Sequence, residues 1–237
     1  MTETEQRPAL RLYGRRKGRP LHTRKKLLMQ ELLPKLLITL KDDTPPLPHG
    51  LFSEGNEIPA PPPVWMEIGF GGGEHLAAQA KLHSDIRFIG CEPFINGVAG
   101  LLDIIDREKL ENIRIFNNDA RLMLDALPDA SLDKCFLLFS DPWPKKRHAG
   151  RRFIGPDNLS RLSRALKPKA LLRLASDHPS HIEWMRECLS IRPDFTCVYA
   201  RAEPPEDWIQ TRYQEKAMRA GRQPFFMDYR RKEREAV

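Results

Sequence analysis

From Val64 onward, short runs of apolar residues alternate with longer stretches in which apolar residues recur every three or four positions. The first pattern predicts buried strands and the second predicts amphipathic helices. The expected strands are Val64–Ile68, Ile86–Gly90, Ile113–Phe116, Leu132–Phe139, Ala170–Ala175, Phe195–Val198 and Phe225–Tyr229. The expected helices between them are Glu74–Leu82, Phe94–Asp106, Ala120–Ala126, Asp157–Leu166 and His181–Leu189. This alternation predicts an α/β protein whose mostly parallel, seven-stranded sheet has helices on both faces.

The chain before residue 64 follows a different pattern. Residues 1–26 are basic, contain two glycines and show no apolar period, which predicts a flexible arm. Apolar residues at helical spacing predict a short helix over Leu27–Leu40, despite Pro34. Residues 44–63 hold seven of the 21 prolines, which indicates a linker. The expected organisation is a basic arm over 1–26, a short helix and proline-rich linker over 27–63, and a main domain over 64–237.

Composition narrows the class of protein. With 237 residues the chain can bury a full core, and 41% hydrophobic with 30% charged residues excludes wholesale disorder, collagen and a coiled coil. No segment approaches the roughly 20 apolar residues that span a bilayer, and the start MTETEQRPAL lacks the apolar core of a secretory signal. The four cysteines form no C-x-x-C pair, so neither a disulfide framework nor a zinc knuckle is expected. We expect a cytoplasmic protein without a membrane segment or a metal site, acting as a monomer or, alternatively, as a homodimer.

Basic residues gather in two clusters. The formal net charge is +7, and residues 1–30 hold nine lysines and arginines against two glutamates. A second cluster, with no acid inside it, spans residues 145–152. A solvated surface would explain either cluster alone. Two clusters in one basic chain favour contacts with the phosphates of a nucleic acid, where affinity comes from counterion release.

A glycine-rich turn follows the first expected strand. The string EIGFGGGE spans residues 67–74, and its glycines let the backbone turn sharply and approach a ligand, as in nucleotide-binding sheets. The dinucleotide fingerprint G-x-G-x-x-G would need a glycine where Glu74 stands. Glu67 would repel a pyrophosphate, but it suits S-adenosylmethionine, which carries a sulfonium and an ammonium group and no phosphate. The alternative for Glu67 is an ordinary solvated acid.

Acidic side chains follow the next two expected strands. Glu92 comes 23 residues after Gly69, where a carboxylate can accept hydrogen bonds from the hydroxyls of a ribose. Asp119 follows the third strand, where a polar side chain commonly faces an adenine amino group, and it can also cap the helix that begins there. With the glycine turn, these acids strengthen the case for a nucleotide-like cofactor, and Glu67 favours S-adenosylmethionine over NAD.

The fourth expected strand runs into the string SDPWPKKRH, which begins at Ser140. Ligands of open α/β sheets bind near such a strand end, and the two prolines stiffen the backbone around Asp141. Trp143 either stacks on a base or fills the core, and the second role is favoured. Together with MEIGFGGGEH and the later TRY at 211–213, this string resembles the bacterial tRNA (guanine-N7)-methyltransferase family over roughly residues 64–230.

The resemblance implies a class I, Rossmann-like, S-adenosylmethionine-dependent methyltransferase fold. It also implies methylation of N7 of the guanine at position 46, in the variable loop of tRNA. The cofactor-binding residues expected are Glu67, Gly69, Gly71, Glu92, Asp119 and Asp141. The substrate-contacting residues implied are Lys145, Asp177, Thr211, Arg212, Tyr213 and Gln214. The RNA-contacting loop of the family matches Arg147, His148, Arg151 and Arg152.

One position departs from the family pattern T-x-[YF]-E. Gln214 stands where the family usually has a glutamate. An amide can still hydrogen-bond the edge of a guanine, but it carries no charge. Glu215 comes next, and it would take over the role if the register bends.

The expected chemistry needs positioning and charge stabilisation. Guanine N7 has an in-plane lone pair and no proton to remove, and methyl transfer is an in-line displacement, so orientation contributes much of the catalysis. Positive charge moves from the sulfonium to the purine, and a fixed carboxylate at Asp141 would stabilise it as it develops. We expect Asp141 to be the catalytic residue in this electrostatic sense. Asp177 would accept from guanine N1–H and N2–H, or would cap the helix that includes His181.

Three other functions stay open at this point. Enzymes that methylate an exocyclic amine carry (D/N)-P-P-(Y/F) after the fourth strand, and here Trp143 replaces the second proline. An NAD-dependent oxidoreductase is disfavoured by Glu67 and Glu74. An RNA-binding module on a degenerate fold would bind tRNA without transferring a methyl group, and the four intact acids argue against it.

Overall fold

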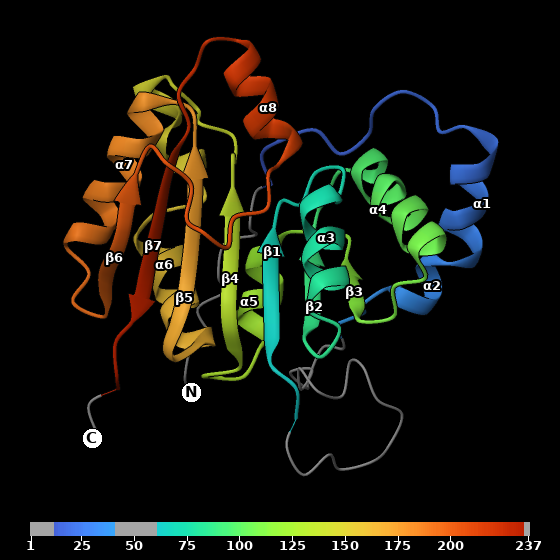
Figure 1. Cartoon of the computed structure of the whole chain (residues 1–237), viewed down its shortest axis with the longest axis horizontal. Coiled ribbons are helices and arrows are strands. Elements are labelled where there is room, and N and C mark those ends of the chain that lie inside the picture. Colours follow the sequence, from blue (N-terminus) through green and yellow to red (C-terminus); the bar gives the residue numbers. More distant parts are fainter. Residues whose placement is uncertain (1–11, 41–60, 235–237) are drawn as a thin grey trace, which may run out of the picture.

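The computed structural model of the chain describes residues 12–40 and 61–234. One seven-stranded sheet forms its centre, in the order β3-β2-β1-β4-β5-β7-β6 (Figure 1). The strands are β1 (Val64–Ile68), β2 (Arg87–Cys91), β3 (Ile113–Phe116), β4 (Leu132–Leu138), β5 (Leu166–Ser176), β6 (Phe195–Arg201) and β7 (Phe225–Arg231). Strands β1 to β5 pair in parallel, whereas β7 runs antiparallel between β5 and β6. The mostly parallel seven-stranded sheet expected from the sequence is confirmed.

Helices cover both faces of this sheet. They are α1 (Thr23–Glu31), α2 (Leu33–Leu36), α3 (Glu74–Leu82), α4 (Ile95–Glu108), α5 (Ala120–Ala126), α6 (Pro156–Ala165), α7 (Pro179–Ser190) and α8 (Arg212–Arg219), with a 3₁₀ helix η1 (Lys146–Arg151). Successive strand residues face opposite sides: Phe88 packs with α3 and α4, while Ile89 packs into the core that includes α5 and α6. In the described part of the chain, no helix is long and apolar enough to cross a membrane.

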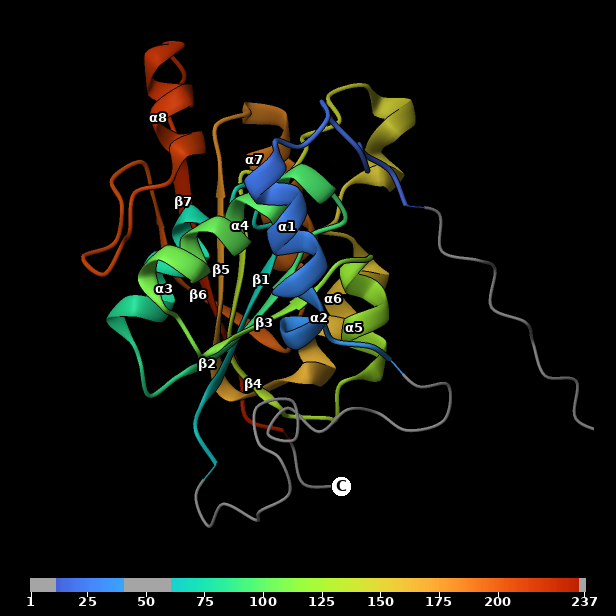
Figure 2. The same ribbon diagram turned by 90° about the vertical axis from the view of Figure 1, so that its right-hand side faces the viewer.

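Part of the predicted flexible arm is ordered, so that prediction is wrong for the part of 1–26 that the structure describes. Helix α1 lies against α4 in both views (Figures 1 and 2). The N–H of Ile95, at the start of α4, donates to the carbonyl of Arg16 at 3.0 Å. The guanidinium of Arg24 pairs with Asp103 on α4 at 2.8 Å. The side chain of Arg24 is therefore held by the acidic face of α4. The first eleven residues lie outside the described residues.

The single helix expected over Leu27–Leu40 is also wrong. Helix α1 begins four residues earlier, and a second short helix contains Pro34 in its first turn. Proline lacks an N–H, so it is tolerated at a helix start and interrupts a helix interior. After α2 the chain is extended, and Ile38 N–H donates to the carbonyl of Ile115 at 2.8 Å. Most of the predicted linker lies outside the described residues.

The remaining elements agree with the apolar pattern to within a few residues, except at two places. Strand β5 begins four residues before the expected Ala170 and continues one residue beyond the expected end. The segment 201–222, where no regular element was expected between the last two strands, contains helix α8. Figure 1 places α8 beyond the carboxyl ends of β4 and β5, which is the edge where a ligand site is expected.

Candidate active site

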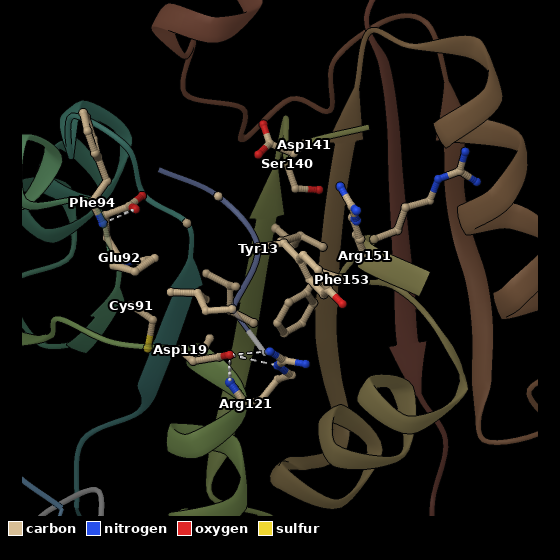
Figure 3. A pocket seen from close by; sticks show the side chains of 18 of the residues that line it. Tyr13, Cys91, Glu92, Phe94, Asp119, Arg121, Ser140, Asp141, Arg151 and Phe153 are labelled. Carbon is tan, nitrogen blue, oxygen red and sulfur yellow. Dashed lines mark hydrogen bonds and ion pairs between the residues drawn. The ribbon is translucent and has the colours of Figure 1, made fainter. Parts of the chain in front are cut away.

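The carboxyl ends of β1 to β4 surround a cavity of about 530 Å³ (Figure 3). Residues that the sequence analysis selected from separate motifs line this cavity together: Gly69, Gly71, Glu92, Asp119, Asp141, Arg151, Arg152 and Tyr213. Four strand ends contribute to one wall, because parallel strands direct their carboxyl ends to the same edge of a sheet. We call this space the main cavity.

The glycine turn forms one side of the main cavity. Gly69, Gly71 and Gly73 have φ angles of +72°, +57° and +83°, which place them in the left-handed region that side chains disfavour. The turn also packs tightly, because a Cβ added to Gly97 on α4 would lie 2.2 Å from the carbonyl oxygen of Gly71. Glycine is therefore required both within the turn and on the helix behind it.

Glu92 joins the end of β2 to this turn. Its carboxylate is buried and accepts the backbone N–H groups of Gly71 at 2.8 Å and Phe94 at 2.9 Å. Burial raises the pKa of the Glu92 carboxyl above its ordinary value, and the charges of Asp141 and Glu67 raise it further, while the two N–H groups oppose this. Each carboxylate oxygen has two lone pairs, so the group can still accept a hydrogen bond from a ligand.

Asp119 caps helix α5, as expected. Its carboxylate accepts the N–H of Arg121 at 3.0 Å and also receives the guanidinium of Arg121, with both carboxylate oxygens 3.0 Å from Nε (Figure 3). The side chain of Arg121 thus lies across the base of the main cavity, where the sequence analysis did not expect a basic group. Because this ion pair occupies the carboxylate, the neighbouring Asn118, which also lines the cavity, is a further polar group available there.

Glu67 lies next to the main cavity and does not line it. Met66 and Ile68 pack into the core on one face of β1, so Glu67 points to the other face, toward α3. There its carboxylate contacts Nδ1 of His75 at 2.8 Å, and both side chains are buried. Glu67 lines a much smaller cavity with Tyr213 and the glycine turn. It is therefore paired and not the solvated acid that was the alternative.

The backbone around Asp141 is held in an unusual conformation. Phe139 and Trp143, on either side of it, have φ angles of +52° and +40°. Such angles are rare for bulky residues and are kept only where the surroundings enforce them. The guanidinium of Arg152 provides that support by donating to the carbonyls of Pro142 at 2.9 Å and Trp143 at 3.2 Å. The carboxylate of Asp141 is exposed at the mouth of the main cavity.

The second basic cluster, residues 145–152, forms a loop that we call the basic loop, and its Arg151 lies across the cavity from Glu92 (Figure 3). The guanidinium of Arg151 lies 4.9 Å from the ring centre of Tyr13 and 5.0 Å from that of Trp143. Trp143 is half-buried and lines the main cavity, so the favoured assignment of this residue to the core is wrong. Burial lowers the pKa of His148 first, and the charges of Arg151 and its basic neighbours lower it further. Arg152 supports the loop backbone from within.

Thr211 and Tyr213 connect α8 to the glycine turn. The hydroxyl of Thr211 caps α8 by accepting the N–H of Gln214 at 3.0 Å. Tyr213 lies over Gly71, where an added Cβ would come within 2.9 Å of its ring, and it lines both cavities. Arg212, beside it, pairs with Glu74 at 3.7 Å. These contacts place Tyr213 at the main cavity and Arg212 beside it, where it lines the smaller cavity.

Gln214 is buried away from the cavities. Its side-chain oxygen accepts the indole N–H of Trp208 at 2.6 Å, and it lines neither the main cavity nor the smaller one. Glu215 does not replace it, because α8 has a regular register and Glu215 contacts Gln210 at 3.3 Å and Arg219 at 3.4 Å. A glutamine serves the bond to Trp208 as well as a glutamate would, since either offers an acceptor.

Asp177 and Lys145 lie outside both cavities. Asp177 pairs with Arg222 at 2.6 Å. The N-cap position of α7 is His178, whose side chain makes no capping hydrogen bond, so the alternative role of Asp177 as the cap is wrong. Lys145 is exposed at the start of η1.

Sequence reasoning missed several residues that line the main cavity. The most informative is Tyr13, an aromatic residue within the basic string RLYGRR, with Leu12 and Arg15 beside it. An aromatic residue between arginines was a signal that could have been noticed. Phe153 and Asn158 also line the cavity and carried no such signal. Within the described residues, no cluster of three histidine, cysteine or acidic side chains is placed to hold a metal ion.

Comparison with known proteins identifies the family and the fold. Residues 61–227 match the model of a family described as "Putative methyltransferase". A tRNA (guanine-N(7)-)-methyltransferase of Paramagnetospirillum magneticum is 44% identical over 94% of each chain, and one of Paracoccus denitrificans is 42% identical over 98% of this chain and 100% of its own. Among solved structures, the 16S rRNA methyltransferase KamB shares 14% identity with a TM-score of 0.54, over 72% of this chain and 88% of its own. The likeness to KamB confirms the class I methyltransferase fold. The match over residues 61–227 shows that this chain belongs to the family described as "Putative methyltransferase".

Proposed function

We propose that this protein transfers a methyl group from S-adenosylmethionine to N7 of a guanine in tRNA, forming N7-methylguanosine. The observation that carries the proposal is Asp141, which lies at the mouth of an acid-lined cavity and is followed at once by the exposed basic loop. The relatives named above support it, since each is a tRNA (guanine-N(7)-)-methyltransferase and matches nearly the whole chain.

The residues of the main cavity fit S-adenosylmethionine. The glycine turn lets the backbone approach a ligand closely, and Glu92 offers carboxylate lone pairs to a ribose. The acids favour a cationic ligand over a phosphate. Glu67 acts through its charge, which is close enough to raise the pKa of Glu92. Asn118, beside the Asp119 carboxylate that Arg121 occupies, offers an acceptor for an adenine amino group.

Asp141 has an electrostatic role in this proposal. The cofactor supplies an activated methyl group on a sulfonium, and guanine N7 needs no deprotonation to receive it. The carboxylate of Asp141 stabilises the positive charge that develops on the purine, and the constrained backbone around it keeps it oriented before reaction. Removal of one such preorganised contact typically costs about 10²–10³ in turnover.

Two segments supply the residues that we assign to RNA binding. Lys145, Arg147, His148 and Arg151 belong to the basic loop, and Arg212 and Tyr213 belong to α8. We assign the loop to phosphate contacts and the α8 residues to the guanine, while Asp177 and Gln214 contribute through Arg222 and Trp208. We further propose guanine 46 in the variable loop as the target and the cytoplasm as the site of action.

One assay tests the activity directly. Unmodified tRNA is incubated with the protein and labelled S-adenosylmethionine, digested to nucleosides and separated. The proposal expects label in N7-methylguanosine and its loss when guanine 46 of the transcript is replaced by adenine. Label in N2-methylguanosine, or tRNA binding without any label, would contradict it. Label that persists without guanine 46 would refute only the position.

A further inference from the structure

Asp207 connects a surface segment to the centre of the sheet. It lies in the connection between β6 and α8, and 61% of its side chain is exposed. Its two carboxylate oxygens nevertheless contact buried cations. Nη2 of Arg173 on β5 lies 2.7 Å from Oδ1, and Nζ of Lys134 on β4 lies 3.2 Å from Oδ2. The side chain of Arg173 is only 3% exposed.

Both cations are also held by contacts that do not involve Asp207. The guanidinium of Arg173 makes two hydrogen bonds with the carboxylate of Asp228 on β7, at 2.8 and 2.7 Å. The ammonium of Lys134 lies 4.6 Å from the ring centre of Trp65 and 5.0 Å from that of Phe136. The sheet therefore offers a rigid, positively charged anchor, and charged hydrogen bonds to such an anchor are among the strong ones.

A chain of contacts leads from this anchor to the candidate active site. The residue after Asp207 is Trp208, whose ring lies 4.6 Å from that of Phe226, edge to face. The indole N–H of Trp208 donates to the side chain of Gln214 on α8. The same turn of α8 carries Tyr213, which lines both cavities. Fixing Asp207 thus fixes Trp208, and Trp208 fixes the first turn of α8.

We propose that Asp207 is a positioning residue: its contacts with Arg173 and Lys134 hold the segment before α8 in place and so set Tyr213 and Arg212 for the substrate guanine. The inference rests on the proposed function, because that function makes the mouth of the main cavity the guanine site. Asp207 itself lines neither cavity. Asp207 therefore raises the fraction of molecules in which α8 is correctly placed. When that fraction is smaller, the apparent affinity for substrate is lower in proportion.

The test compares Asp207→Asn with Glu206→Gln, which removes the adjacent exposed acid. Both proteins are labelled with 5-fluorotryptophan, and the resonance of Trp208 is assigned with Trp208→Phe. We expect Asp207→Asn to raise KM for tRNA about tenfold, with kcat within about threefold and cofactor affinity within about twofold of the parent. The Trp208 resonance should shift or broaden in Asp207→Asn, remain unchanged in Glu206→Gln, and be largely restored in Asp207→Glu.

Equal KM values for Asp207→Asn and Glu206→Gln, or an unmoved Trp208 resonance, would overturn the inference. Thermal unfolding of each variant shows whether it is folded. A tenfold rise in KM supports positioning only if Asp207→Asn unfolds at a temperature close to that of the parent. If the parent transfers no methyl group to tRNA, the proposed function fails, while the fluorine spectra still decide whether Asp207 holds the segment.

Discussion

The backbone N–H of Gly71 donates to Oε2 of Glu92 at 2.8 Å, which ties the glycine turn after β1 to the end of β2. The carboxylate of Glu92 thus holds the glycine turn and also lines the main cavity. A substitution at this position affects the shape of the cavity as well as its charge.

Glu92→Gln should weaken binding of S-adenosylmethionine by about tenfold or more. The amide keeps only one oxygen, so one of the two backbone N–H groups loses its acceptor, and hydrogen bonds to a charged group are worth about 1.5–3 kcal/mol. Titration calorimetry measures the effect. Glu111→Gln, which removes an exposed acid before β3, is the matched control and should leave the affinity unchanged. Equal affinity in both variants would remove Glu92 from the cofactor site.

Asp141→Asn should lower the rate of methyl transfer by about 10²–10³. The shape of the side chain is kept, the charge is removed, and the residue is exposed beyond the end of β4, so the fold should survive. Single-turnover transfer with saturating tRNA and cofactor is the decisive measurement. The affinity for tRNA should change little, because phosphate contacts dominate it. A rate within a few-fold of the parent would make Asp141 a turn residue only.

The ordered part of the arm should contribute to the salt dependence of tRNA binding. Deleting the whole arm is a poor test, since residues 12–15 line the main cavity. The double substitution Lys17→Gln with Arg19→Gln removes two exposed charges outside that lining instead. It should reduce the slope of log K against log salt by roughly 0.7–0.9 for each phosphate that the arm no longer neutralises. Lys169→Gln with Lys232→Gln is the control, and an equal slope in both would make the arm a solvated surface.

Stability should fall as the pH drops from about 6.5 to about 4, in part because of His181. This side chain is fully buried and its Nε2 has no partner among the described residues, and burial lowers its pKa to about 4. In that pH window the unfolded chain binds a proton that the folded chain does not, so protonation favours unfolding by at most roughly 3 kcal/mol. His181→Gln should flatten this part of the curve of unfolding free energy against pH. The exposed control His22→Gln should keep it, and a parallel curve in His181→Gln would show that His181 is not the cause.

Much of the fold could be predicted because apolar residues mark the buried strands as short runs and the helices as a repeat of three to four residues. Strand β1, helix α3 and strand β3 begin and end where the apolar pattern places them. The type of residue at Tyr13 was a signal, but its place in the cavity wall could not be predicted, because that place depends on Arg151 and Trp143, which lie far along the chain. Period alone does not say which contacts form between distant segments.

The candidate site was predictable to a similar extent. The motifs located Glu92 and Asp141 at strand ends, since strand ends are properties of local sequence. They did not reveal the face of β1 from which Glu67 projects, nor its partner His75, because both depend on how α3 packs. The same applies to Gln214, whose departure from the family pattern could be interpreted only once Trp208 was seen to donate to it.

Strands β1 and β4 are neighbours at the centre of the sheet, with Met66 opposite Cys135. Three helices and two strands lie between them in sequence, so this pairing closes a long loop, and the entropy lost in closing such a loop slows folding. Residues at the ends of both strands line the main cavity, and the cavity is therefore complete only when the two strands have paired. A ligand that binds only the finished state, at about a hundred times its Kd, adds about 2.7 kcal/mol to the free energy of unfolding. The amount of ligand bound in the cavity therefore measures the fraction of correctly folded chains during refolding.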